Sequence, residues 1–296
     1  MSSHLKSVLQ ALLVTFLWST SVIIIKIGLQ TLPPLIFAGL RYGLACLLLL
    51  PLAWRILRQN PVTLTRRDWW RLVALGLVMY TLTQGAQFLA LQYLPAASHS
   101  MMLNGTAILV LVIGVVWLSE YPTRLQMIGL LIFLGGVLLY FLQADFSGTQ
   151  MIGLAIAAFQ VVANAGAAAL GRAVNRAATI PALLITTISM GVGAVVLIGA
   201  GLLTQELPQL DLQAVVIIFW LAGINTAFAF TLWNHTQRTL TAMESSMINN
   251  TMLVQIGLLA WVFLGESLSL QQIIGMIAAA GGILLVQLRR SSGSKR

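Results

Sequence analysis

The 296-residue sequence has few charged residues. They make up 8% of the chain, whereas a typical soluble domain carries about 25%. Acidic residues are the scarcer kind, because 7 Asp and Glu stand against 16 Lys and Arg, which leaves a net charge of +9. Apolar residues reach 59%. This composition excludes a water-soluble enzyme, and the basic balance indicates either nucleic acid or a membrane surface as the partner.

Residues that carry catalysis or bind metals are also scarce. Cys46 is the only cysteine, which excludes an internal disulfide framework and a thiolate metal cluster. The three histidines lie on different predicted elements, and the sequence has no Walker-type loop, GxGxxG or HExxH motif. We therefore expect no enzyme, no metal site and no cofactor. The alternative of a membrane lipid-modifying enzyme would need an acid or histidine such as Glu244 or His235.

Long apolar runs are abundant. A helix that crosses the hydrocarbon core needs about 20 mostly apolar residues, and the sequence holds ten runs of about that length. The eight prolines fall at or near the ends of these runs, where a missing N–H costs least. The first run has no small-x-small cleavage site behind it, so we expect a retained span. The predicted spans 1 to 10 cover residues 5–29, 34–54, 70–92, 96–118, 124–143, 150–171, 180–203, 213–236, 242–264 and 269–288.

The positive charges lie almost entirely on one side of this ten-span layout. Of the 16 basic residues, Lys26 and Arg41 fall well inside spans, and the remaining fourteen fall at the termini, in the even-numbered loops or within two residues of these. We expect the protein to lie in the inner membrane of the cell. The positive-inside rule then predicts that both termini, including a polar tail at 289–296, face the cytoplasm. No nucleic acid is needed to explain the charge. We expect Lys26 to snorkel toward its end of span 1 and Arg41 to need an internal partner.

The two halves of the sequence are related by a shift of 146 residues. Each half contains five spans, an odd number, so the second half must enter the membrane in the opposite sense. The sequence therefore predicts an all-α integral membrane protein with two inverted five-helix repeats, residues 1–145 and 146–288. Two inverted halves that close on a site at the midplane are typical of transporters. The matched polar pairs are Asn104 with Asn250, Glu120 with Glu266, and Gln126 with Gln272.

Polar residues inside spans mark candidate positions on a pathway, because they cost free energy unless they face protein or water. They cluster in spans 1, 3, 4, 6, 8 and 9 and are almost absent from spans 5 and 10. The alternative for any one of them is a hydrogen bond between packed helices. The predicted substrate-binding residues are Trp18, Ser21, Gln84, Gln87, Asn104, Gln160, Asn164, Asn225, Asn249 and Asn250.

Three residues are candidates for proton coupling: Glu244, His99 and His235. The alternative for Glu244 and His99 is a place in the interface near a span end, where water reaches them. Glu120 and Glu266 end spans 4 and 9 at equivalent positions. We expect each of these two to favour the positive amino terminus of the helix that follows it.

Spans 5 and 10 carry matched glycine pairs in place of polar residues. These are Gly135 with Gly136 and Gly281 with Gly282. Small residues let helices approach closely within a membrane. We expect the pairs to serve close helix packing or a homodimer formed through spans 5 and 10.

Two further motifs resemble a known family. The stretch LWSTSVIIIKIGLQTLPPLIFAGLRYGLACLLLLPL, residues 17–52, is similar to the opening of EamA-type carriers of the drug/metabolite transporter superfamily, with Trp18, Lys26, Pro34 and Arg41 at recurrent positions. The segments GVVWLSE and LAWVFLGE, followed by IGLLIFLGGVLL and IGMIAAAGGILL, resemble the end of each repeat. The resemblance covers essentially the whole chain.

The resemblance implies a secondary transporter of small metabolites, often an exporter of amino acids or related compounds, with a central cavity and no need for ATP. Such repeats usually place a proline where this sequence has Ala107 and Leu253. The family's gating geometry is therefore not carried over, and Asn104 and Asn250 are candidate cavity contacts instead. The partners expected are a small-molecule substrate and the lipid bilayer. The alternative is a non-transporting membrane sensor or assembly partner.

Overall fold

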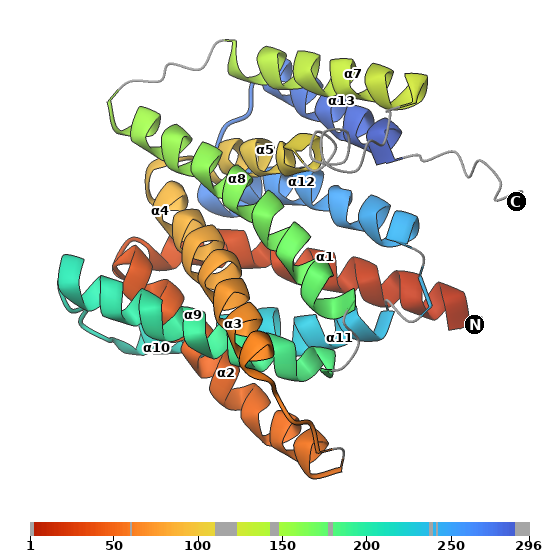
Figure 1. The fold of residues 1–296 in the computed structure, drawn as a ribbon. Helices are drawn as coiled ribbons and strands as arrows, with labels where there is room; N and C mark the ends of the chain where they lie inside the picture. The colour runs from red at the N-terminus through yellow and green to blue at the C-terminus, as the bar shows by residue number, and fades with distance from the viewer. Residues whose placement is uncertain are drawn as a thin grey trace, which may run out of the picture.

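The computed structural model describes residues 3–59, 61–109, 123–142, 148–176, 180–236, 239–240 and 242–287. The described residues form helices joined by short connections, with no strand among them (Figure 1). Eight helical segments are long and apolar enough to cross a membrane, and the apolar helix at Leu270–Val286 is slightly shorter. The prediction of an all-helical, multi-pass membrane protein is confirmed.

The first repeat follows the predicted spans closely. Span 3 is one continuous helix whose middle is π-helical, and the second half of span 4 lies outside the described residues. Pro51 lies inside the second helix, which continues to Gln59, so the expectation that every proline would fall at a helix end was wrong there. The elements are α1 (Ser3–Gly28), α2 (Pro34–Gln59), α3 (Arg66–Leu75), η1 (Gly76–Gln84), α4 (Gly85–Tyr93), α5 (Ala96–Asn104) and α7 (Arg124–Phe141).

The second repeat has the same succession of elements. Its third helix, span 8, again contains a π-helical middle. The tail at 289–296 and the predicted boundary between the repeats near residue 145 lie outside the described residues. The elements are α8 (Thr149–Arg176), α9 (Ala182–Thr204), α10 (Leu212–Ala222), η2 (Gly223–Phe228), α11 (Ala229–Thr236), α12 (Ala242–Leu264) and α13 (Leu270–Gln287).

The starts of α7 and α13 show the repeat at the level of local hydrogen bonds. At α7, Thr123 Oγ1 accepts from the Gln126 amide at 3.3 Å and Gln126 Oε1 accepts from the Thr123 amide at 2.9 Å. Ser269 and Gln272 make the same reciprocal pair at α13, at 3.2 and 2.9 Å. Each is a capping box that satisfies free N–H groups at a helix start. The sequence match between the halves thus reflects equivalent local structure.

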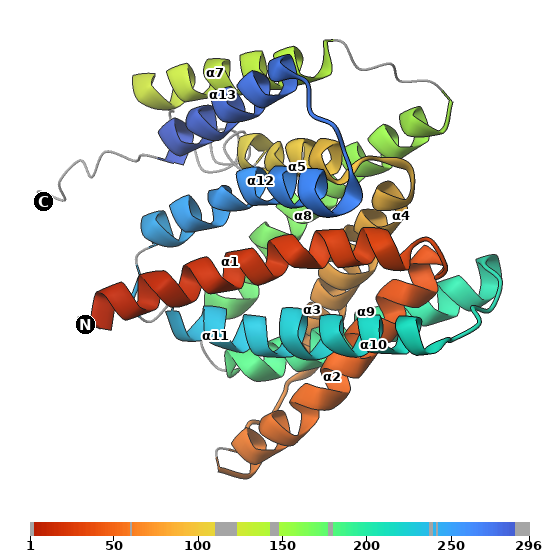
Figure 2. The ribbon, with the colours of Figure 1, turned by 180° about the vertical axis from the view of Figure 1, so that it is seen from behind.

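Helix packing follows the inverted repeat. The repeat-related helices α2 and α9 pack against each other, as do α7 and α13. Helix α1 packs on α11 and α12, and its counterpart α8 packs on α4 and α5. Figures 1 and 2 show that the first residues of α1 and the end of α13 lie on the same side of the bundle. Replacing each helix by its counterpart in the other repeat turns one set of pairings into the other. This symmetry supports two inverted halves.

The α7 and α13 backbones touch at glycines. A Cβ added to Gly136 would lie 2.6 Å from the Gly275 carbonyl oxygen, and one added to Gly129 would lie 2.6 Å from that of Gly282. Nothing lies within 4 Å of a Cβ at Gly135 or at its counterpart Gly281. The two glycines of each predicted pair therefore differ. Gly136 and Gly282 lie in the contact between the two helices of one chain, whereas Gly135 faces away from that contact.

The π-helical segments η1 and η2 lie in the third helix of each repeat. Both begin at a glycine, and in each a threonine hydroxyl donates to the carbonyl five residues earlier: Thr83 to Val78 at 2.9 Å, and Thr226 to Leu221 at 2.8 Å. Short π-helical turns occur often at functional sites. Irregular backbone is thus present near the middle of spans 3 and 8, where the sequence contains no proline to signal it.

The residues that replace the family's prolines behave differently in the two repeats. In span 4, a turn at Gly105, two residues before Ala107, interrupts the helix. In span 9, α12 continues through Leu253 without a break. The helix of span 9 is therefore continuous where the family's proline is missing, while Gly105 interrupts the helix of span 4.

Candidate functional site

The first polar contact inside the bundle joins η2 to α1. Asn225 is fully buried, and its Nδ2 donates to the Leu17 carbonyl and, at 3.2 Å, to Thr20 Oγ1. Its Oδ1 is also buried and has no hydrogen-bond partner in the part of the chain that the structure describes. The Asn225 amide nitrogen therefore joins η2 to α1 by hydrogen bonds, whereas the amide oxygen has no partner among the described residues.

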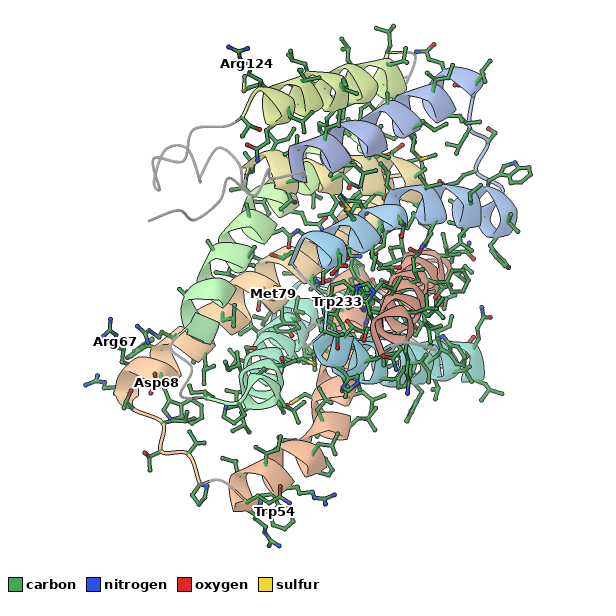
Figure 3. The ribbon with its side chains drawn as sticks, turned by 90° about the vertical axis from the view of Figure 1, so that its right-hand side faces the viewer. Trp54, Arg67, Asp68, Met79, Arg124 and Trp233 are labelled. Atoms are coloured by element: carbon green, nitrogen blue, oxygen red, sulfur yellow. The ribbon has the colours of Figure 1, made fainter. Side chains whose placement is uncertain are left out.

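An aromatic cluster lies next to this contact. The ring of Trp18, on α1, is 5.4 Å from the ring of Phe230 and 5.2 Å from that of Trp233, centroid to centroid. All three side chains are partly buried. Trp233 lies near the centre of the bundle when the molecule is viewed from the end where α1 begins (Figure 3). Trp18 thus shares an apolar wall with α11, which the sequence alone did not indicate.

Two consecutive residues of α2 contact the two π-helical segments. Tyr42 donates from its hydroxyl to Gln84 Oε1 at 2.8 Å, and its ring is 5.4 Å from that of Tyr80 in η1. Arg41, which is 4% exposed, donates from Nε to Thr226 Oγ1 of η2 at 3.0 Å. The internal partners expected for Arg41 are therefore a hydroxyl group and the face of the Tyr42 ring, 5.1 Å from the guanidinium carbon. Neither is a carboxylate.

Two polar pairs join span 4, which contains α5 and Thr106, to helix α8. His99 Nε2 is 2.8 Å from Gln160 Oε1, and both side chains are buried. One helical turn further along α8, Asn164 Nδ2 donates to Thr106 Oγ1 at 3.3 Å. His99 is 1% exposed, so the alternative that it lies in a hydrated interface was wrong. Asn104 bonds within its own helix, to the Ser100 carbonyl at 2.7 Å.

The repeat-related contact between α1 and α12 is also polar. Ser19 is fully buried and donates from its hydroxyl to Gln255 Oε1 at 2.9 Å. At the start of the same two helices, His4 Nε2 lies 2.8 Å from Glu244 Oε1. Both of these side chains are substantially exposed, so Glu244 lies at a span end, as its alternative interpretation held. Sequence reasoning missed Gln255, although it lies five residues after Asn250.

The turn between α4 and α5 is held by two charged residues from elsewhere in the bundle. Lys26 Nζ donates to the Leu91 and Leu94 carbonyls at the end of α4, at 2.6 Å each. The Glu266 carboxylate accepts from the Ala96 and Ala97 amides at the start of α5, at 2.6 and 3.2 Å. The Lys26 ammonium is therefore bound to protein carbonyls at the end of span 3, and Glu266 caps a helix of the other repeat rather than the helix that follows it.

The remaining predicted residues are dispersed. Ser21 is buried, Gln87 and Asn250 are partly buried, and Asn249 and His235 are exposed. Nothing in the described contacts joins His235 to His99 or Glu244 in a relay. Glu120 and the side chain of Arg172 lie outside the described residues.

Comparison with known proteins identifies the family. The model of the EamA-like transporter family matches residues 5–142 and again residues 151–288. The chain belongs to the EamA-like transporter family. The two matches cover nearly the whole sequence, and each contains five predicted spans, as expected for an EamA-type member of the drug/metabolite transporter superfamily.

Relatives of this EamA protein include transporters and probable efflux pumps. A probable amino-acid metabolite efflux pump of Salmonella typhimurium is 26% identical over 93% of this chain and 92% of its own. An uncharacterized transporter of Archaeoglobus fulgidus is 35% identical, over 43% of each chain. A solved crystal structure with 17% identity superimposes with a TM-score of 0.68, covering 96% of this chain and 98% of the other, and shows that the fold is shared.

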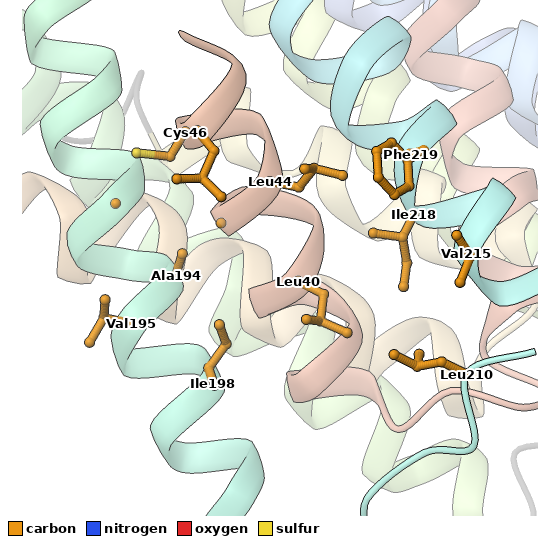
Figure 4. Close-up of a pocket in the computed structure, with 13 residues that line it drawn as sticks. Leu40, Leu44, Cys46, Ala194, Val195, Ile198, Leu210, Val215, Ile218 and Phe219 are labelled. Carbon is orange, nitrogen blue, oxygen red and sulfur yellow. The ribbon is translucent and has the colours of Figure 1, made fainter. Parts of the chain in front are cut away.

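This EamA chain also carries an apolar groove on its outer surface. The groove has a volume of about 520 Å³ and is lined by α2, α9 and α10 together with Leu210. Figure 4 shows Leu40 and Leu44 of α2 between Ile198 of α9 and Phe219 of α10. None of the ten predicted substrate-binding residues lines it. Its walls are apolar and belong to spans 2, 7 and 8, so the groove does not contain the polar residues predicted for the pathway.

Proposed function

We propose that this EamA-family protein exports small metabolites of the amino-acid class, by alternating access between its two inverted repeats. Its place is the inner membrane, with both termini in the cytoplasm. Support for the class of cargo comes from the probable amino-acid metabolite efflux pumps among its relatives. Support for the orientation comes from the charge bias and from the ends of α1 and α13, which lie on one side of the bundle.

One observation carries the mechanism. Polar side chains meet inside the bundle at two interfaces that are exchanged by the repeat, α1 with α12 and α5 with α8. Each interface joins one helix of the first repeat to one helix of the second. Polar pairs of this kind cost little to separate when water or a polar cargo replaces the partner. The two interfaces therefore suit a pathway that opens on one side while it closes on the other.

We expect purified protein in liposomes to move a labelled amino acid or a close derivative without ATP. The panel should include neutral, acidic and basic amino acids with their amides, because uncharged residues dominate the polar contacts described above. Saturable efflux of at least one compound, absent from empty liposomes, supports the proposal. Folded protein that moves none of the panel contradicts it and favours a sensor or assembly role.

Cysteine labelling tests whether the polar residues line a pathway that water reaches. In a Cys46→Ser background, cysteines that replace Gln84, Asn104 or Asn250 should react with a membrane-impermeant maleimide added from either side. The matched control is Val195→Cys on α9, because Val195 is an apolar residue, 72% exposed, on the outside of a predicted span, where we expect lipid rather than water. If cysteines at the test positions are as unreactive toward the maleimide as the control cysteine, the bundle is packed and has no pathway that water reaches.

A further inference from the structure

Arg41 is a buried cation with no carboxylate partner among the residues that the structure describes. It is 4% exposed, and no carboxylate of the described residues lies within ion-pair distance of it. The sequence explains why. The seven acidic residues all fall at span ends or between spans: Asp68, Glu120, Asp145, Glu206, Asp211, Glu244 and Glu266.

A guanidinium in this situation has unused capacity for hydrogen bonding. Arginine presents five N–H donors in a rigid planar fork, and the contact with Thr226 uses the Nε–H alone. The described residues give no hydrogen bond to the two terminal nitrogens. A carboxylate matches the geometry of this fork and forms short, charge-assisted bonds with it. Leaving a buried charge uncompensated costs several kcal/mol, so binding an anion there is favourable.

The residue next to Thr226 has an unsatisfied atom of its own, on the α1 side of the same segment. Asn225 Oδ1 is a fully buried acceptor with no partner among the described residues, on the same π-helical segment that Arg41 contacts. A carbonyl oxygen in this state suits a donor such as an ammonium or amine. Segment η2 therefore presents a free acceptor on its α1 side and binds an uncompensated cation on its α2 side.

We propose that Arg41 is a specificity-determining residue, which binds the carboxylate of the transported metabolite when η2 separates from α2. The inference rests on the proposed transport function and narrows its substrates to compounds with a free carboxylate. The contact that must open is the hydrogen bond from Arg41 Nε to Thr226 Oγ1 at 3.0 Å, which joins α2 to η2.

Transport selectivity distinguishes this role from a structural one. The probes are L-leucine and L-leucinamide, which differ in the carboxylate, taken up into liposomes that contain wild-type, Arg41→Gln or Arg41→Lys protein. Wild type should prefer the acid by at least about tenfold, as expected for loss of a charge-assisted pair. Arg41→Gln should remove this preference and Arg41→Lys should retain part of it. The ratio does not depend on how much variant folds. Arg58→Gln, which changes an arginine stacked on Trp54 near the end of α2, should keep the wild-type ratio.

Two outcomes overturn the inference. The first is a wild-type protein that transports the acid and the amide equally well. The second is an acid preference in Arg41→Gln equal to that of the wild type, whatever the absolute rates, which indicates a structural arginine. A binding measurement separates these from failure of the transport proposal: the rise in melting temperature of the solubilised protein with L-leucine should exceed that with L-leucinamide, and only when Arg41 is present. Acid-selective stabilisation without transport would overturn the export function and leave the carboxylate site standing, whereas its absence would overturn the site.

Discussion

Replacing Gly136 with leucine is expected to destabilise the protein strongly, whereas the same change at the neighbouring Gly135 is expected to be nearly neutral. A Cβ at Gly136 would meet backbone atoms of α13, among them the Gly275 carbonyl oxygen at 2.6 Å. Backbone cannot rotate away as a side chain can, so α7 and α13 must move apart. Overpacking of this kind costs about 1–3 kcal/mol. Separation of the two helices also breaks the Gln126 and Gln271 bonds to opposite carbonyls, at 3.1 and 2.8 Å.

Thermal unfolding of the detergent-solubilised variants checks this expectation, because the two substitutions add the same apolar volume to adjacent positions of one helix. Gly282→Leu and Gly281→Leu repeat the comparison on α13, where the roles of the two glycines are the same. Equal melting temperatures within each pair would contradict the packing shown by the structure.

The same variants address the predicted homodimer through spans 5 and 10. Leu131, Leu134 and Leu138 of α7 are exposed, so this helix presents an apolar face beyond its contact with α13. If that face and Gly135 form a dimer interface, Gly135→Leu should lower the mass of the purified species measured by light scattering while leaving its melting temperature nearly unchanged. An unaltered mass would leave Gly135 in contact with lipid only.

The sequence predicts the helices and their inverted arrangement because both depend on local composition. Any run of about 20 apolar residues must satisfy its own backbone and so becomes a helix in lipid. The capping boxes of Thr123 with Gln126 and of Ser269 with Gln272 are equally local. Thr226 shows the limit: a single hydroxyl that donates to a carbonyl five residues back marks a π-helical turn, and no proline or glycine pattern requires it.

The candidate site was less predictable because helical spacing tells which residues share a face and not which neighbour that face meets. Asn249 and Asn250 are adjacent, yet one is exposed and the other partly buried. Glu266 was expected to act on the next helix in sequence, and instead it caps α5, which lies 170 residues away from it along the chain. Arg41 needed a partner, but only the packing of α2 on η2 identifies it as Thr226.

Replacing Glu266 with alanine is expected to lower transport strongly, because Glu266 and Lys26 hold the turn between α4 and α5 at its two ends. Carboxylate oxygens at a helix start and an ammonium at a helix end each complement the helix dipole. The contacts are charge-assisted and contribute about 1.5–3 kcal/mol each. Glu266→Ala should therefore release the start of α5 and favour a state that is open on this side of the bundle, with a transport rate lowered at least about tenfold.

Accessibility reports the released state directly. Ser98, at the start of α5, is buried and hydrogen-bonded to the Tyr140 hydroxyl at 3.3 Å. In a Cys46→Ser background, a cysteine that replaces Ser98 should react slowly with an impermeant maleimide, and faster when Glu266→Ala or Lys26→Met is added. Glu206→Gln is the matched control, because Glu206 is an exposed acid in the connection after α9. If labelling and transport in the Glu266 and Lys26 variants equalled those in this control, the contacts of Glu266 and Lys26 with the turn would be static packing contacts. If they differ as expected, the turn moves during the transport cycle and these two charges set how long it stays closed.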